Sequence, residues 1–129
     1  MTLIELQAEL ASGRVTSRAL VEDSLAKIAD PSGEGARCFL TVYADAARRQ
    51  ADLVDAARKQ GLPLAAFAGA PLSIKDLYDV AGEVTRAGSK ARDGEAAASE
   101  DAEAVRLVRR AGFIVVGKAR TNQLASKYA

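Results

Sequence analysis

Lys75 is the residue of this sequence with the clearest potential for chemistry. It ends a short alternating run, PLSIK at 71–75, in which Leu72 and Ile74 share one set of positions and Ser73 and Lys75 share the other. This alternation predicts a β-strand, with the lysine near its carboxyl end. Lysine is among the residues least often buried, so its place in a run that resembles a protein interior needs a reason.

The local pattern leaves three interpretations of Lys75 open. It could be a strand-end lysine paired with a nearby carboxylate, a Schiff-base lysine of an aldolase-like or decarboxylase reaction, or a desolvated general base that activates a serine. The third interpretation requires a pKa well below the free value of about 10.4, which burial and neighbouring donors can produce.

The sequence contains no histidine. This absence excludes Ser-His and Cys-His nucleophile pairs, histidine-ligated zinc and a histidine general base within these residues. A base supplied by these residues would therefore be a lysine, a carboxylate or a less usual group, which adds interest to Lys75.

A second lysine, Lys118, stands in a near match to a phosphate-binding loop, Gly112-x-x-x-x-Gly117-Lys118. The four intervening residues are Phe-Ile-Val-Val, which form an apolar strand and cannot cradle phosphates, and Ala119 follows where the loop needs Ser or Thr. The segment therefore indicates a helix end followed by a buried strand.

Three carboxylates, Asp76, Asp79 and Glu83, could be considered as metal ligands, but acidic residues at a strand end and in a loop are more often caps and turn formers. No metal and no cofactor is expected. Cys38 is the only cysteine, so no internal disulfide can form, and we expect it to be a small buried hydrophobe beside Phe39.

The composition fits a single soluble globular domain of 129 residues, with 49% hydrophobic and 27% charged residues. Eighteen basic residues oppose 17 acidic ones, which gives no strong attraction to nucleic acid or an anionic membrane. No stretch approaches the roughly 18 apolar residues of a membrane span. Glu5 and Glu9 are atypical of a secretion signal, so a cytoplasmic location is expected.

Helical patterns dominate residues 1–61. The capping pair Thr2 and Glu5 predicts a helix over 3–12, ended by Gly13, and a second helix runs from about 16 to the Asp-Pro pair at 30–31. "CFLTVY" is a short extended or helix-entry piece. A third helix follows over 44–60. Its residues predicted to face a core are Ala47, Leu53 and Val54, and those predicted to face water are Arg48, Arg49, Arg58 and Lys59.

Residues 62–129 predict a strand, helix, strand crossover: a strand at 71–75, a Gly-rich connection, a helix at 101–111 and an apolar strand at 113–118. The helix is expected to bury Ala104, Val105, Leu107, Val108 and Ala111. Parallel sheets normally have more than two strands and are covered by helices on both faces. Two parallel strands alone would not form such a sheet. We therefore expect residues 1–129 to be the N-terminal part of a single larger domain.

The segment "GAPLSIKDLYDVAGEVTRAGSKAR" closely resembles the amidase signature family, whose members hydrolyse amides with a Ser, cis-Ser, Lys triad. The likeness continues in "TSRALVEDSLAKIA", "CFLTVYADAARRQAD" and "DAEAVRLVRRAGFIVVGKARTNQLAS". The residues that fall in register are Gly69, Pro71, Lys75, Asp76, Gly82, Thr85, Gly88, Ser89, Gly112, Gly117 and Lys118. Ala119 and Gln123 differ from the family's common Thr and Glu.

The resemblance implies an α/β fold, a mixed sheet covered by helices, and one catalytic residue among these 129, Lys75. In the family the neutral amine of the triad lysine takes a proton from the bridging cis-serine, which takes one from the nucleophilic serine. Both serines and the oxyanion hole belong to a Gly- and Ser-rich stretch that these residues lack. Ser73, Ser89, Ser99 and Ser126 are not substitutes, and Ser73 and Ser89 are expected to be scaffold hydrogen bonders.

The resemblance implies that a longer protein hydrolyses non-peptide C–N bonds and that the 129-residue chain is inactive alone. The expected partners are a small-molecule amide and the remainder of the amidase domain, without direct contact to nucleic acid or membrane; a homo-oligomer is left open. Two alternatives remain: the amidase subunit of a tRNA-dependent amidotransferase, and a truncated, non-catalytic binding module.

Overall fold

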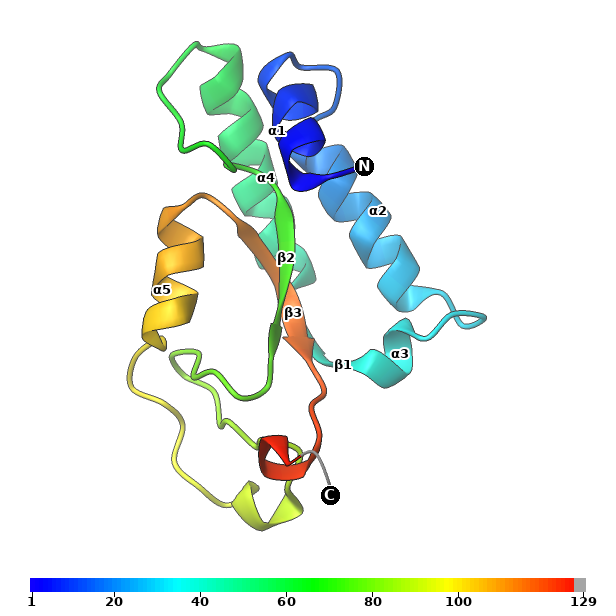
Figure 1. Cartoon of the computed structure of the whole chain (residues 1–129), viewed down its shortest axis with the longest axis vertical. Helices are drawn as coiled ribbons and strands as arrows, with labels where there is room; N and C mark the ends of the chain where they lie inside the picture. Colours follow the sequence, from blue (N-terminus) through cyan, green and yellow to red (C-terminus); the bar gives the residue numbers. More distant parts are fainter. Residues whose placement is uncertain (127–129) are drawn as a thin grey trace.

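The computed structural model describes residues 1–126 and shows a mixed α/β fold built on a three-stranded sheet (Figure 1). The strands are β1 (Phe39–Val42), β2 (Pro71–Lys75) and β3 (Ile114–Ala119), in the order β1-β3-β2. Strand β3 is central, parallel to β2 and antiparallel to β1. The predicted fold class is confirmed.

Two long helices cover one face of the central strand. Helices α2 (Ser17–Ala29) and α4 (Ala44–Lys59) pack on each other and on β3. Alternate residues of a strand point to opposite faces, and on this face Ile114 and Val116 enter a core with Val21, Leu25, Ala47 and Ala51. Helix α1 (Leu3–Ala11) begins with the predicted Thr2–Glu5 capping box, and Thr16 caps α2 as predicted.

The other face of the sheet carries a smaller core beneath helix α5 (Glu103–Arg110), which connects β2 to β3 as the predicted crossover. This core consists of Ile74, Val80, Val105 and Val115. The prediction that Ala104 and Leu107 are buried is wrong: both are exposed, Leu107 by 52%. Helix α5 has eight residues, and Val105 is its only buried one.

Strand β1 is the main difference from the sequence-based expectation. The segment left as extended or helix-entry forms a short helix α3 (Gly35–Cys38) and then β1, which pairs with β3 through Thr41 opposite Lys118 and Val42 opposite Gly117. Residues 1–61, expected to be helical, therefore also supply a sheet strand. A Cβ at Gly117 would lie 2.4 Å from the Thr41 carbonyl oxygen, so the glycine of the GK pair allows close approach of β1.

Three further side chains differ from their predicted environments. Cys38 is exposed rather than buried, because the short helix α3 holds it away from both cores. Leu53 is 71% exposed on α4. Arg58, predicted to lie in water, is partly buried and donates to the carbonyl oxygen of Ala68 at 2.7 Å, which ties α4 to the loop before β2.

Two single 3₁₀ turns complete the described chain, Lys90–Arg92 and Gln123–Ala125. Among residues 1–126, no helix combines the length and the apolar character that a bilayer crossing requires.

Candidate active site

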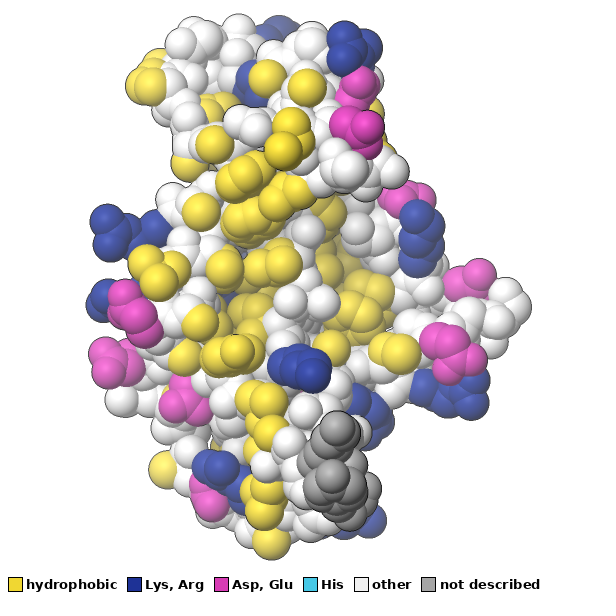
Figure 2. Space-filling model, in the orientation of Figure 1, with side chains coloured by type: hydrophobic (Ala, Val, Ile, Leu, Met, Phe, Trp, Pro, Cys, Tyr) yellow, Lys and Arg dark blue, Asp and Glu magenta, His cyan; other side chains and the backbone are white. Residues whose placement is uncertain are grey.

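Lys75 is the last residue of β2, and its side chain is exposed. Its two neighbours along the chain, Ile74 and Asp76, are buried. Lys75 helps to line a shallow depression whose other lining residues are Leu72, Ser73, Ile74, Tyr78, Ala104, Val105 and Val108. Figure 2 shows hydrophobic side chains spread over the region of β2 and β3. The amine therefore stands on the rim of an apolar, open surface.

Directly after Lys75, the carboxylate of Asp76 forms a buried ion pair with Lys118 of β3. Lys118 Nζ lies 3.0 Å from Asp76 Oδ1, and the two side chains are only 2% and 3% exposed. Lys118 is the largest fully buried side chain of the described residues. The sequence pattern places Lys118 in a buried strand and not in a phosphate-binding loop. Its charge is compensated by Asp76 within the fold.

Glu83 and Tyr43, which are partly buried, adjoin this ion pair. Glu83 Oε2 lies 4.0 Å from Lys118 Nζ and accepts a hydrogen bond of 2.8 Å from the Tyr43 hydroxyl. Burial, assisted by the adjacent Glu83 carboxylate, raises the pKa of the Tyr43 phenol above its usual value. The phenol therefore stays protonated and able to donate over the whole physiological range.

Each of the three carboxylates considered as metal ligands has a partner within the protein, and Asp76 and Glu83 share Lys118. Asp76 pairs with Lys118, Glu83 accepts from Tyr43, and Asp79 Oδ1 accepts from the Thr85 hydroxyl at 2.6 Å. Within residues 1–126, no three His, Cys, Asp or Glu side chains gather in an arrangement suited to a metal ion. Asp79 acts here as an organiser of the loop after β2.

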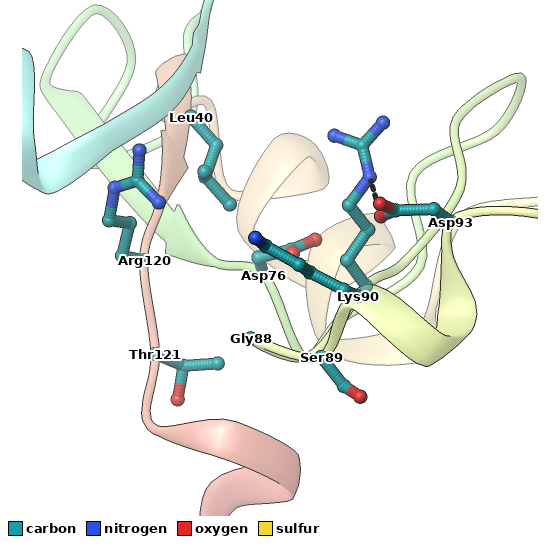
Figure 3. Close-up of a pocket in the computed structure, with 9 residues that line it drawn as sticks. Leu40, Asp76, Gly88, Ser89, Lys90, Asp93, Arg120 and Thr121 are labelled. Carbon is teal, nitrogen blue, oxygen red and sulfur yellow. Dashed lines mark ion pairs between the residues drawn. The ribbon is translucent and has the colours of Figure 1, made fainter.

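A second pocket, which Asp76 helps to line, lies between the loop after β2 and the segment after β3 (Figure 3). An ion pair of 2.9 Å between Arg86 and Asp93 lies at its wall, and Lys90 reaches across it in this view. The pocket is lined by Leu40, Asp76, Arg86, Gly88, Ser89, Lys90, Asp93, Arg120 and Thr121. Sequence reasoning did not find this pocket, because its lining comes from segments far apart in the chain.

The four serines set aside as nucleophiles are dispersed. Ser89 is buried and donates its backbone N–H to the Arg86 carbonyl at 2.9 Å, whereas Ser73 is exposed beside Lys75. Neither hydroxyl hydrogen-bonds within residues 1–126, so the expected scaffold role holds for the Ser89 backbone and not for the two side chains. Ser99 and Ser126 are both exposed.

Comparison with known proteins identifies the class to which this fold belongs. The amidase family model matches residues 19–129, and the chain therefore belongs to the amidase signature family. The chain is 39% identical over 127 residues to a glutamyl-tRNA(Gln) amidotransferase subunit of Myxococcus xanthus, covering 97% of this chain and 25% of that protein. It is 33% identical over 125 residues to the AtzE subunit of 1-carboxybiuret hydrolase from a Pseudomonas species, covering 97% and 27%.

Solved structures agree with the sequence comparison. A complex described as revealing the evolutionary origins of an s-triazine catabolic enzyme superposes with a TM-score of 0.85 at 32% identity, over 95% of this chain and 27% of its own. The peptide amidase of Stenotrophomonas maltophilia superposes with a TM-score of 0.80 at 31% identity, over 95% and 25%. The chain thus spans about a quarter of the length of these relatives.

Proposed function

We propose that this chain supplies the general base, Lys75, to a longer protein that hydrolyses the C–N bond of a non-peptide amide. The proposal is supported by membership of the amidase signature family together with the position of Lys75 in that family's motif and at the end of β2. The nucleophilic serine, the bridging serine and the oxyanion hole come from polypeptide outside these 129 residues. The reaction takes place in the cytoplasm, in keeping with a chain that has one cysteine.

The proposed step needs an uncharged amine at Lys75. In the longer protein, further polypeptide covers the apolar surface around β2 and removes water from the amine, which favours its neutral form. The Nζ lone pair then accepts the proton of the bridging serine, and that serine accepts the proton of the nucleophile as its oxygen bonds to the amide carbon. The C–N bond then breaks as the leaving nitrogen takes the proton from Lys75 by way of the bridging serine, and water hydrolyses the acyl-enzyme.

Replacement of Lys75 tests this role directly. Lys75→Ala in the longer protein is expected to reduce kcat for a simple amide by a factor of about 10² to 10⁴, the usual contribution of a positioned general base. The variant should still fold, because the Lys75 side chain belongs to neither hydrophobic core of residues 1–126. Lys59→Ala, at an exposed lysine that ends α4, is the matched control and should retain full activity.

Borohydride trapping distinguishes the proposed base from the Schiff-base alternative. If Lys75 formed an imine, borohydride would trap a carbonyl substrate on it, whereas the amidase proposal predicts no such adduct. Retention of amide turnover by Lys75→Ala would remove Lys75 from the mechanism.

The 129-residue chain alone is expected to be inactive, because no stretch of it combines the glycines and serines that expose a nucleophile and build an oxyanion hole. Assaying the purified chain beside the longer protein tests this. Turnover by the short chain would show that the catalytic group has been assigned wrongly. Should the coding sequence lack a Gly- and Ser-rich stretch beyond codon 129, a non-catalytic binding module becomes the better account.

A second function, the amidase subunit of a tRNA-dependent amidotransferase, is favoured by the 39% identity to the glutamyl-tRNA(Gln) amidotransferase subunit of Myxococcus xanthus. In this role the longer protein would hydrolyse glutamine and pass ammonia to a partner. Affinity purification of the longer protein from its own cells distinguishes the two functions. Stoichiometric partner proteins, together with glutamine hydrolysis that depends on them, would favour the amidotransferase, and full activity without partners would favour the amidase.

A further inference from the structure

The buried ion pair between Asp76 and Lys118 is the strongest feature that the proposed chemistry leaves unused. Both side chains are almost completely enclosed, and Nζ and Oδ1 are 3.0 Å apart. The second oxygen of Asp76, Oδ2, is buried without a hydrogen-bond partner within residues 1–126. Burying such a pair costs much of the solvation of both ions, and well-packed apolar residues are often as stable or more stable in its place. Stability alone therefore explains this pair poorly.

The pair is joined to Lys75 by the backbone. Lys75 immediately precedes Asp76 and lies opposite Ala119, the residue after Lys118. The Asp76 N–H donates to the Ala119 carbonyl oxygen at 2.8 Å, so the strand pairing continues one residue past Lys75. The hydrogen bond fixes the Lys75–Asp76 peptide group, and the ion pair fixes the side chain of the residue that follows Lys75.

Within residues 1–126, Lys118 Nζ forms ion pairs with two carboxylates but has no hydrogen-bond partner. Glu83 lies 4.0 Å from Nζ on one side, and its carboxylate is oriented by the Tyr43 hydroxyl at 2.8 Å. Lys118 belongs to the central strand, between β1 and β2. An anchor on the central strand thus acts on the end of the edge strand that carries Lys75.

We propose that the Asp76–Lys118 pair is a positioning pair, which fixes the direction in which the Lys75 side chain leaves β2 and so aligns its amine with the serines. This proposal rests on the proposed function of Lys75. Asp76 and Lys118 act through Lys75 and do not touch substrate. A displacement of the reacting amine by about 1 Å would be expected to cost about 10²-fold in rate.

The test uses the longer protein and separates positioning from stability. The variants are Asp76→Asn and the double variant Asp76→Leu with Lys118→Met, which replaces the pair by apolar side chains of similar size. Asp23→Asn is the matched control, since it removes an exposed pair of 2.7 Å with Lys27 on α2. Each rate is divided by the concentration of active serine, titrated with a serine-directed fluorophosphonate, so that unfolded protein does not count.

Positioning predicts a kcat per active serine about 10- to 100-fold lower in both variants, with KM unchanged within about threefold, while Asp23→Asn keeps both values. The double variant should unfold at the same urea concentration as the parent or a higher one. If it does not fold, Asp76→Asn alone decides.

Two results would overturn the proposal: a kcat per active serine within twofold of the parent, which would make the pair purely structural, or a raised KM with unchanged kcat, which would make it part of the substrate pocket. Failure of the proposed function of Lys75 can be distinguished from failure of the positioning proposal. In the former case Lys75→Ala would remain active, whatever the rates of the Asp76 variants.

Discussion

The side chain of Lys75 is exposed between two buried neighbours, Ile74 and Asp76. Strand alternation explains this arrangement, because neighbouring residues of a strand point to opposite faces. The alternation and the strand end could be predicted from the letters PLSIK. The exposure of Lys75 could not, because it depends on which segments distant in the sequence pack near the end of β2.

Glu22 shows how a single side chain links α2 to α4. Its carboxylate accepts hydrogen bonds from Arg48 at 2.9 Å and from Arg18 at 2.8 Å. The hydrogen bond from Arg48, followed by that from Arg18, lowers the pKa of Glu22 from 4.5 to about 2. A carboxylate with a lowered folded-state pKa stabilises the fold above its unfolded pKa, and this contribution disappears as the pH falls through the folded value.

We therefore predict that Glu22→Gln makes the free energy of unfolding depend less on pH between 4.5 and about 2. Urea unfolding measured over this range, at low salt to limit screening, gives the slopes to compare. Glu100→Gln is the matched control, since Glu100 is exposed and makes no ion pair within residues 1–126. Equal slopes for Glu22→Gln and the parent would contradict the assignment.

Helix ends were the most predictable elements, and Gly112 and Gly61 show why. Both glycines follow a helix with positive φ, +93° at Gly112 after α5 and +69° at Gly61 after α4, where the helices predicted over 101–111 and 44–60 end. Their surroundings differ. A Cβ at Gly112 would lie 2.6 Å from the Ala68 Cα, whereas nothing stands within 4 Å of one at Gly61.

This difference predicts unequal costs for the same substitution. Gly61→Ala introduces only the strain of a left-handed backbone, which should lower the free energy of unfolding by about 1 kcal/mol. Gly112→Ala adds a steric clash with the backbone of the loop before β2 and should lose about 3 kcal/mol or more. Chemical denaturation of both variants measures the difference. Equal losses of unfolding free energy would show that the backbone at Ala68 moves to accommodate the added Cβ.

Strand β1 could not be predicted with the same success. "CFLTVY" has six residues, too few for a period to distinguish a strand from a helix entry. Its identity depends on pairing with β3, 75 or more residues away, where Gly117 leaves room for the Thr41 carbonyl. The ion pair of Lys118 has the same origin: the sequence placed Lys118 in a buried strand, but its partner Asp76 comes from a different strand end. Non-local pairing decided both features, and local letters do not encode it.

At the scale of the molecule, apolar side chains near β2 and α5 are exposed. The sequence predicts an incomplete sheet, and an incomplete sheet leaves apolar side chains uncovered. Leu107 on α5 is 52% exposed, and Tyr78, which helps to line the Lys75 depression, is 44% exposed. Contiguous apolar surface of this kind drives association in water.

We predict that the isolated 129-residue chain self-associates as its concentration rises, and that Leu107→Glu weakens this association. Sedimentation velocity over a concentration series measures both effects. Ala26→Glu, at an exposed position of α2, is the control for added charge and should associate like the parent chain. A monomer at all concentrations would show that the apolar surface is too small or too divided to drive contact.

The central claim is that the amine of Lys75 serves as a base for a serine pair supplied by the rest of the longer protein. The most direct measurement is the distance from Lys75 Nζ to the nearest serine Oγ in a crystal structure of that longer protein. The account predicts hydrogen-bond reach, about 2.6–3.2 Å, in a site closed to bulk water. An amine in open solvent with no serine pair near it would contradict the account.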